Sequence, residues 1–195
     1  KDNKHLSIYK TLKAKTTSMV KKILILAILL LVLSSCRNEE EIFLDLDMPR
    51  RTYTGKELRT DGYYYSGYIH TNKMGTLMLF RNGVCMFTYF DYRYGDATHY
   101  IENDKWGNKS YMNEVRSKPD GIGVFSVLRN VLECQIFFSG SGRVTQNCTG
   151  EILNDTTLRL TSWRYNRYGH VENIDELYYF KAFNNKPDST SSFIK

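Results

Sequence analysis

The feature that most constrains the fold of this chain is a series of short β-branched and aromatic segments separated by turn-forming residues. In residues 132–138 the apolar Leu132, Cys134 and Ile136 occupy alternate positions, so an extended strand would have one apolar side. Such a series predicts an all-β fold. We expect an antiparallel meander of seven or eight strands that closes into a barrel, because closure leaves no exposed strand edge. A β-sandwich is the alternative that the same number of strands allows.

Turn signals assign a register to the hairpins. Asn82-Gly83 is the strongest signal and predicts a two-residue type I′ turn. Further turns are expected at residues 129–130, 140–142 and 154–156, and we find no sustained helical period between the strands. Matching the apolar sides of neighbouring strands fixes their partners, since a slip of one residue would turn buried side chains toward water. The predicted partners are Phe125 with Cys134, Val127 with Leu132, Phe138 with Val144, Cys134 with Cys148, and Ile152 with Leu158.

The N-terminal part has the pattern of an export signal. An unbroken apolar run, Ile23–Leu33, follows Lys21 and Lys22. This run is shorter than the roughly 20 residues that a membrane-spanning helix needs. A charged start before a short apolar core is typical of a signal peptide. We therefore expect residues 19–35 to be a signal peptide that starts at Met19, and residues 1–18 to be an upstream extension.

The apolar run ends in Leu33-Ser34-Ser35-Cys36, which resembles the bacterial lipobox. The resemblance implies lipidation of Cys36, and acyl chains anchor a protein at about 0.8 kcal/mol for each buried CH₂ group. The acidic residues 39–41 resemble a surface-export signal and also suit a solvated tether. We expect a lipoprotein of the outer membrane, with the surface-exposed leaflet as one of two options. The expected parts are the lipidated cysteine and acidic tether (36–58), the barrel (59–184) and a flexible tail (185–195).

The charge distribution argues against nucleic-acid binding. The chain has a formal net charge of +6, from 27 basic and 21 acidic residues. Seven of the basic residues and one of the acidic residues lie in residues 1–35, which leaves 20 of each sign in the rest of the chain. A nucleic-acid-binding domain needs a basic patch on its folded part. We therefore expect no nucleic-acid partner.

Two stretches resemble the lipocalin-like domains of bacterial lipoproteins. They are residues 123–127 with the following turn and Leu132, and residues 150–158, and the likeness extends over about Gly62 to Phe183. The resemblance implies a small antiparallel barrel of the calycin type. It implies no catalytic residues.

The spacing of chemically active residues does not indicate an enzyme. The motif of a nucleophile elbow is absent from the sequence, and His70, His99 and His170 lack the close spacing of metal ligands. Carboxylates at 91, 96, 102 and 104 could supply a pair for glycoside chemistry, but proteins with long loops offer such pairs by chance. We expect a non-enzymatic protein without a metal or another cofactor.

Aromatic residues supply the candidate binding site. Tyrosine and tryptophan combine an apolar face with a polar group, which suits the binding of sugars, peptides and partner surfaces. Residues 163–168 mix aromatic and basic side chains with turn-forming residues, so we expect a surface loop there that binds a glycan, a small amphiphile or an envelope protein. The candidate ligand-binding residues are Trp163, Arg164, Tyr165, Arg167 and Tyr168. The alternative is a structural or accessory subunit of an outer-membrane complex, with no ligand cavity.

The cysteines allow one more expectation. Export exposes a chain to oxidising conditions, and the predicted register places Cys134 and Cys148 on facing positions of adjacent strands. A disulfide between them is therefore possible, with Cys85 left over. The alternative is three reduced thiols that act as small apolar side chains in the core.

Overall fold

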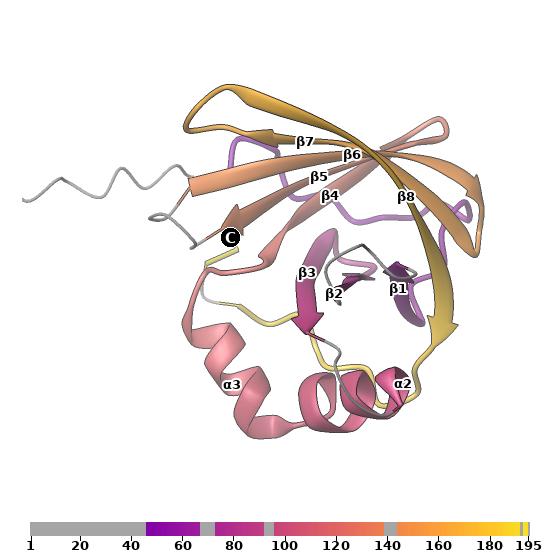
Figure 1. Ribbon diagram of the computed structural model, residues 1–195, viewed down its shortest axis with the longest axis vertical. Coiled ribbons are helices and arrows are strands. Elements are labelled where there is room, and N and C mark those ends of the chain that lie inside the picture. Colours follow the sequence, from indigo (N-terminus) through magenta and orange to yellow (C-terminus); the bar gives the residue numbers. More distant parts are fainter. Residues whose placement is uncertain (1–45, 67–72, 92–95, 139–143, 192, 195) are drawn as a thin grey trace, which may run out of the picture. The chain divides into compact units, whose positions relative to one another are not determined.

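The computed structural model describes residues 46–66, 73–91, 96–138, 144–191, 193 and 194. Its eight strands are antiparallel and close into a barrel in the order of the sequence, with β8 paired to β1 (Figure 1). The predicted all-β barrel is confirmed, and the β-sandwich alternative is wrong. The strands are β1 (Gly62–Ser66), β2 (Lys73–Leu79), β3 (Val84–Asp91), β4 (Ile122–Leu128), β5 (Val131–Phe138), β6 (Val144–Asn154), β7 (Thr157–Tyr165) and β8 (His170–Ala182).

The five predicted strand partners are all present in the barrel. Phe125 faces Cys134 and Val127 faces Leu132 between β4 and β5. The partners predicted between β5 and β6, and between β6 and β7, are also confirmed. The expected loop at residues 140–142 lies outside the described residues. Alternation of buried side chains was therefore enough to set the register of these three hairpins.

The turn at Asn82-Gly83 differs from the prediction. Phe80 N–H donates to the Val84 carbonyl at 2.9 Å, and Gly83 N–H donates to the Phe80 carbonyl at 2.9 Å. These bonds enclose a three-residue loop instead of a two-residue type I′ turn. Gly83 has a φ of +84°, the left-handed conformation that follows a type I turn in hairpins of this length. The type I′ prediction is wrong, because that turn requires a positive φ at both central residues and only Gly83 has one here.

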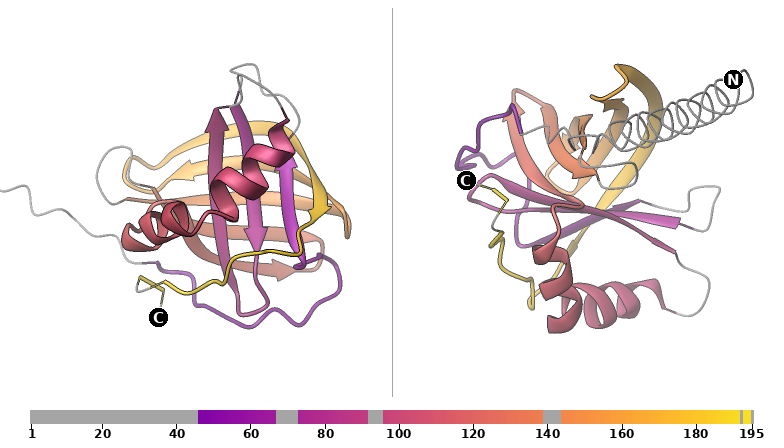
Figure 2. Two further views of the ribbon diagram at one scale, coloured as in Figure 1. Left: turned by 90° about the horizontal axis from the view of Figure 1, so that it is seen from below. Right: turned by 90° about the vertical axis from the view of Figure 1, so that its left-hand side faces the viewer.

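A helical segment between β3 and β4 was not predicted. It comprises α2 (Ala97–His99), the π-helix η1 (Tyr100–Trp106) and α3 (Lys109–Ser117). The Asn108 side chain accepts hydrogen bonds from the N–H groups of Ser110 and Tyr111, which caps the N-terminus of α3. The helices lie across the outer face of the sheet formed by β2 and β3 (Figure 2).

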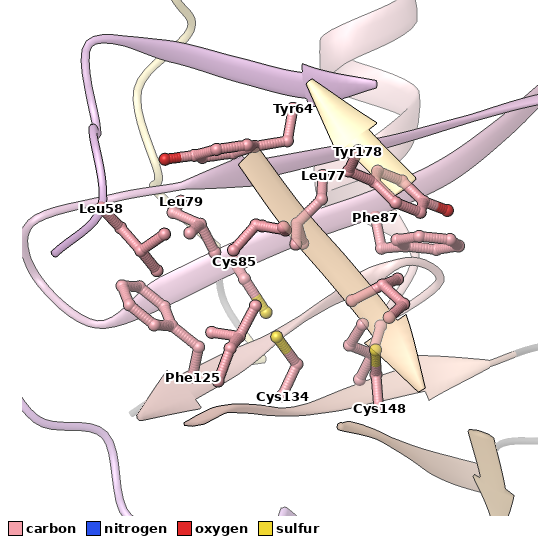
Figure 3. Packing of buried hydrophobic residues seen from close by; sticks show 14 of the residues in the cluster. Leu58, Tyr64, Leu77, Leu79, Cys85, Phe87, Phe125, Cys134, Cys148 and Tyr178 are labelled. Carbon is pink, nitrogen blue, oxygen red and sulfur yellow. The ribbon is translucent and has the colours of Figure 1, made fainter. Parts of the chain in front are cut away.

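The barrel wall separates two hydrophobic cores. The inner core fills the barrel and includes Leu77, Leu79 and Phe125 (Figure 3). The outer core lies between β1–β4 and the helical segment, and it includes Met78 and Trp106. Residues 77–79 are buried on both sides of the sheet for this reason. Both cores belong to the compact unit Ile42–Lys195, and we therefore expect this unit to fold without Lys1–Glu41.

The chain segments on either side of the strands are more ordered than expected. Tyr53 and Leu58 are part of the inner core, with 8% and 1% of their surfaces exposed. In the tail, the Lys186 ammonium group donates hydrogen bonds to the carbonyls of Thr60 and Leu79, and Ile194 joins the outer core. The expected tether at 36–58 and the expected flexible tail at 185–195 are therefore wrong for these residues, which pack as parts of the barrel domain.

Candidate functional site

The candidate site lies where β3 and β4 separate. Their ladder contains only three residue pairs, which extend from Val84 to Met86 of β3. Phe87 N–H makes one more bond, to the Gly121 carbonyl at 2.7 Å. Beyond this point β3 continues to Asp91 in pairing with β2, and no described strand pairs with its other edge. The barrel wall is therefore incomplete along the second half of β3.

Gly121 marks the point at which the wall opens. Its carbonyl accepts from Phe87 N–H on β3, and its own N–H donates to the Phe137 carbonyl on β5 at 2.8 Å. Gly121 has a φ of +73°, and a Cβ atom there would lie 2.3 Å from the Phe87 carbonyl oxygen. Only glycine fits this junction without strain. Past Gly121 toward α3, the chain no longer pairs with β3.

A pocket of about 360 Å³ occupies this opening. This volume is within the usual range for small-molecule sites. The pocket adjoins both cores, since Phe87 and Trp163 belong to the inner core and Trp106 belongs to the outer core. Its lining combines apolar and aromatic side chains with a polar rim, namely Met86, Phe87, Thr88, Tyr89, Trp106, Tyr111, Glu114, Val115, Lys118, Asp120, Gly121, Ile136, Phe137, Phe138, Gln146 and Trp163.

Two tryptophan N–H groups in this lining have no hydrogen-bond partner. Trp106 and Trp163 are 2% and 5% exposed, and the Nε1 atom of each is buried without a partner among the described residues. A buried donor without a partner costs about 1–3 kcal/mol, and native proteins contain few of them. The chain has only two tryptophans, and both line the pocket. The pocket is thus lined by two tryptophans whose N–H groups are buried and have no partner among the described residues.

Ring contacts hold the two indoles in place. The Trp163 ring packs against Phe87 with the centroids 4.8 Å apart, and the Trp106 ring packs against Phe90 at 5.7 Å and Tyr111 at 6.2 Å. All three contacts have the edge-to-face geometry that aromatic rings prefer. The donors are therefore preorganised, which lowers the cost of binding.

The polar rim of the pocket contains one basic and two acidic side chains, Lys118, Glu114 and Asp120. Lys118 Nζ and Glu114 Oε1 form an ion pair at 2.8 Å at the end of α3, and each group shifts the pKa of the other toward its charged form. Burial raises the pKa of the Tyr111 hydroxyl, so Tyr111 stays neutral. No group of three potential metal ligands occurs among the described residues. The pocket therefore suits a neutral or weakly charged apolar ligand better than an ion.

The residues of the predicted recognition loop do not form one loop. Trp163, Arg164 and Tyr165 are in strand β7, and Trp163 points into the core instead of toward solvent. Tyr165 stacks on His170 with the ring centroids 6.0 Å apart. Of the five residues, only Arg167 and Tyr168 lie in the turn between β7 and β8. The prediction of a surface loop is wrong for the three strand residues, and Trp163 belongs to the pocket instead.

The turn between β7 and β8 still exposes an aromatic side chain. Tyr168 is 64% exposed, and the Arg167 guanidinium lies 5.6 Å from the centroid of its ring. A ligand-binding role for this turn stays a prediction.

The three barrel cysteines form a buried cluster in the inner core. All of them are free thiols, although Cys134 and Cys148 face each other as predicted. The sulfur atoms of Cys85 and Cys134 point toward one another (Figure 3). Burial raises the pKa values of the Cys85 and Cys148 thiols. The structure therefore matches the alternative expectation, in which the thiols are reduced and lie in the core. Cys85 belongs to the same cluster as Cys134 and Cys148.

Other predicted positions carry no site. Cys36 lies outside the described residues. Glu102, one of the carboxylates considered for catalysis, accepts a hydrogen bond from the Tyr63 hydroxyl at 3.1 Å and pairs with Lys181 at 3.1 Å. Its contacts are those of a residue that attaches the helical segment to the barrel.

Sequence reasoning missed the pocket because its walls come from distant parts of the chain. One available signal was the length of the connection between the hairpin at Asn82-Gly83 and the strand that starts near Gly123, since loops this long in compact domains are usually functional or structured. The presence of only two tryptophans in separate regions gave no hint that they share a site.

Comparisons with protein-family models, with curated proteins and with solved structures found no match to this chain. Within the part of the chain that the structure describes, no helix is both long and apolar enough to cross a membrane.

Proposed function

We propose that this protein is a lipid-anchored, non-enzymatic binding protein of the bacterial outer membrane, and that its ligand occupies the pocket between β3 and β5. The observation that carries the binding role is that the two tryptophans lining one pocket both have a buried indole N–H without a partner among the described residues. A ligand with acceptor groups would remove the cost of leaving them unpaired. The lipocalin-like resemblance of the strands supports a binding barrel, and the lipobox-like sequence at Cys36 supports the anchor.

The lining indicates the chemistry of the ligand. Aromatic and aliphatic side chains dominate the lining of the pocket, and its charged groups are the Lys118–Glu114 ion pair and Asp120. We expect an apolar, uncharged molecule with a carbonyl or ether oxygen. Such a molecule matches the small amphiphile that we considered from the sequence.

The binding role can be tested by intrinsic fluorescence, because both tryptophans line the pocket. The unit Ile42–Lys195 is titrated with N-hexylbenzamide, which has a carbonyl acceptor, and with hexylbenzene, which has none. We expect the amide to shift the tryptophan emission and to bind at least about tenfold more tightly, since each unpaired buried donor costs about 1–3 kcal/mol. Equal or absent binding of the two probes would contradict the proposal.

A matched pair of variants locates the site. Trp163→Phe removes one indole donor from the pocket, whereas Tyr168→Ala removes the exposed ring of the β7–β8 turn. We expect the first variant to weaken binding of N-hexylbenzamide and the second to leave it unchanged. The opposite result would place the recognition site on the turn.

The anchor is tested separately by metabolic labelling. Cells that express the full chain are fed a labelled fatty acid, and we expect label in the parent protein but not in Cys36→Ala, which should also be released from the membrane fraction. Membrane association without any label would contradict lipidation and would leave the binding role unaffected.

An accessory subunit of an envelope complex is the second candidate function. Its support is the filled inner core together with exposed apolar side chains on β4–β6, where Leu128, Val131 and Leu153 are 75%, 41% and 44% exposed. Exposed apolar side chains on a rigid sheet are typical of partner surfaces. A constitutive partner that copurifies with the parent protein, and is lost in Leu128→Asp, would favour this function.

A further inference from the structure

The opening between β3 and β5 has the geometry of a place for one more strand segment. Strand β4 lies between β3 and β5 only from Ile122 onward, and the chain before it turns away into α3. Strand β3 continues five residues past that point, to Asp91, whereas β5 ends one residue past it, at Phe138. The pocket therefore lies where β4 would lie if it began a few residues earlier.

The edge of β3 presents backbone groups to this space. Residues of a strand alternate in the direction of their N–H and C=O groups. Phe87 directs its N–H away from β2 and toward Gly121, so Tyr89 directs its N–H to the same side. The described residues contain no strand that pairs with Tyr89 on that side. The Tyr89 backbone is thus in position to pair with an added strand.

The lining is apolar on both sides of the place that such a strand would occupy. Toward the barrel interior the pocket has Phe87, Ile136 and Trp163, and toward the helical segment it has Trp106 and Val115. Successive side chains of a strand point to opposite faces. Consecutive apolar residues of one peptide would therefore be accommodated alternately in the two regions.

The two indoles add a second indication. Trp106 and Trp163 belong to the cores on opposite sides of the wall, both line the pocket, and their buried N–H groups have no partner among the described residues. The backbone of a peptide supplies one carbonyl acceptor at every residue, whatever its side chains are. Tyr89 and Phe138, which are 42% and 37% exposed, place an aromatic ring on each of the two strands that border the opening.

We propose that the pocket binds an extended, uncharged apolar peptide segment of a partner protein, which adds to the edge of β3 in the position of the missing start of β4. This inference rests on the proposed binding function and names its ligand class. Strand addition to an exposed edge is a general mode of peptide recognition, in which main-chain bonds give affinity and side-chain pockets give specificity.

The test uses the full chain in phosphatidylcholine vesicles and the acetylated, amidated pentapeptide Thr-Val-Phe-Val-Thr, with tryptophan emission as the readout. The matched control is the same peptide with a methyl group on the backbone nitrogen of its phenylalanine, which blocks strand pairing and retains the side chains. We expect the parent peptide to bind and the N-methyl peptide to bind at least tenfold more weakly. A ¹³C label on the phenylalanine carbonyl should give an amide band at a β-sheet frequency in the bound state.

Two variants of the chain complete the design. Tyr89→Pro removes the edge N–H and should weaken peptide binding at least tenfold, and circular dichroism reports whether the variant is folded. Leu128→Ala lies outside the pocket and should bind the peptide as the parent does. If the N-methyl peptide binds as tightly as its parent, strand addition is overturned while the pocket stays a ligand site. If neither peptide nor N-hexylbenzamide changes the emission, the proposed function fails as well.

Discussion

Leu58 provides the sharpest test of the boundary of the barrel domain. The sequence places this residue in a tether, but its side chain is 1% exposed and belongs to the inner core. Its backbone N–H donates to the Tyr53 hydroxyl at 2.8 Å, and the next N–H, of Arg59, donates to the Tyr64 hydroxyl at 2.9 Å. The main chain at Leu58 is therefore fixed by two buried tyrosines and cannot relax easily into a cavity.

These contacts set the expected size of the effect. Replacing a buried leucine with alanine costs about 2–5 kcal/mol, and more where the site cannot collapse. For Leu58→Ala we expect about 3–4 kcal/mol, which is a large part of the about 5–15 kcal/mol that stabilises a typical domain. The matched control is Leu128→Ala, because Leu128 is 75% exposed and its loss should change the free energy of unfolding by less than about 0.5 kcal/mol.

Urea unfolding of Ile42–Lys195, followed by circular dichroism, measures both variants. A tether residue would behave as the exposed control does, so equal midpoints for the two variants would refute the placement of Leu58 in the core. A chain that starts at Arg59 should be even less stable, because it also lacks Tyr53 and its hydrogen bond to the Arg81 carbonyl.

Three further predictions concern the turns, the tail and the thiols. Gly83→Ala should lower the free energy of unfolding in urea by about 1–3 kcal/mol, because a Cβ atom would lie 2.1 Å from the Arg51 carbonyl oxygen. Its control is Gly169→Ala, whose Cβ atom would meet nothing within 4 Å and which should lower that free energy by about 1 kcal/mol. Burial lowers the pKa of Lys186 from 10.5 to about 8, so between these pH values the unfolded state binds more protons than the folded state. The free energy of unfolding of the parent should therefore rise with pH from 8 to 10, and this rise should be absent in Lys186→Met. Iodoacetamide at pH 8 should label the three barrel cysteines only at the rate of unfolding, and a disulfide-linked peptide in a non-reduced digest would contradict the reduced cluster.

The strand registers could be predicted because they depend on a local pattern. Buried and more exposed residues alternate over 131–134 of β5 and 147–153 of β6, and a single register matches the buried residues of both strands. In β2 and β3 the alternation is hidden, because the helical segment buries the outer face as well. The pattern predicts strands there but not what covers them.

The helical segment has only a short sequence signal. The apolar side of α3 consists of the buried Met112 and the partly buried Tyr111 and Val115, which pack against the outer core. Its cap at Asn108 was recognisable in principle, but a single capping residue is common in turns as well. Tertiary packing of Trp106 and Ile101 against the sheet, and not a local pattern, holds this segment in place.

The placement of Trp163 depended on a feature that alternation cannot reveal. The pairing of β7 with β8 shifts between Leu160 and Ser162, which indicates a bulge. Leu160 and Trp163 are three residues apart, yet both belong to the inner core. A regular strand would turn one of them outward. The basic and polar neighbours of Trp163 therefore indicated a loop, although the strand continues to Tyr165.

The unpaired indoles lead to a last prediction, on the balance between stability and binding. Both tryptophans can be replaced biosynthetically by 3-benzothienylalanine, which keeps the size of the ring and replaces N–H with sulfur. Because each buried unpaired N–H costs about 1–3 kcal/mol, the ligand-free protein should become more stable, whereas a change to phenylalanine would add a cavity and obscure the effect. The same replacement should weaken binding of N-hexylbenzamide at least about tenfold, since its carbonyl loses its donors. Urea unfolding and emission of a ligand-borne fluorophore measure the two effects independently. If the replacement lowers stability, then the indole N–H groups have partners in the free protein, and the argument that they await a ligand is wrong.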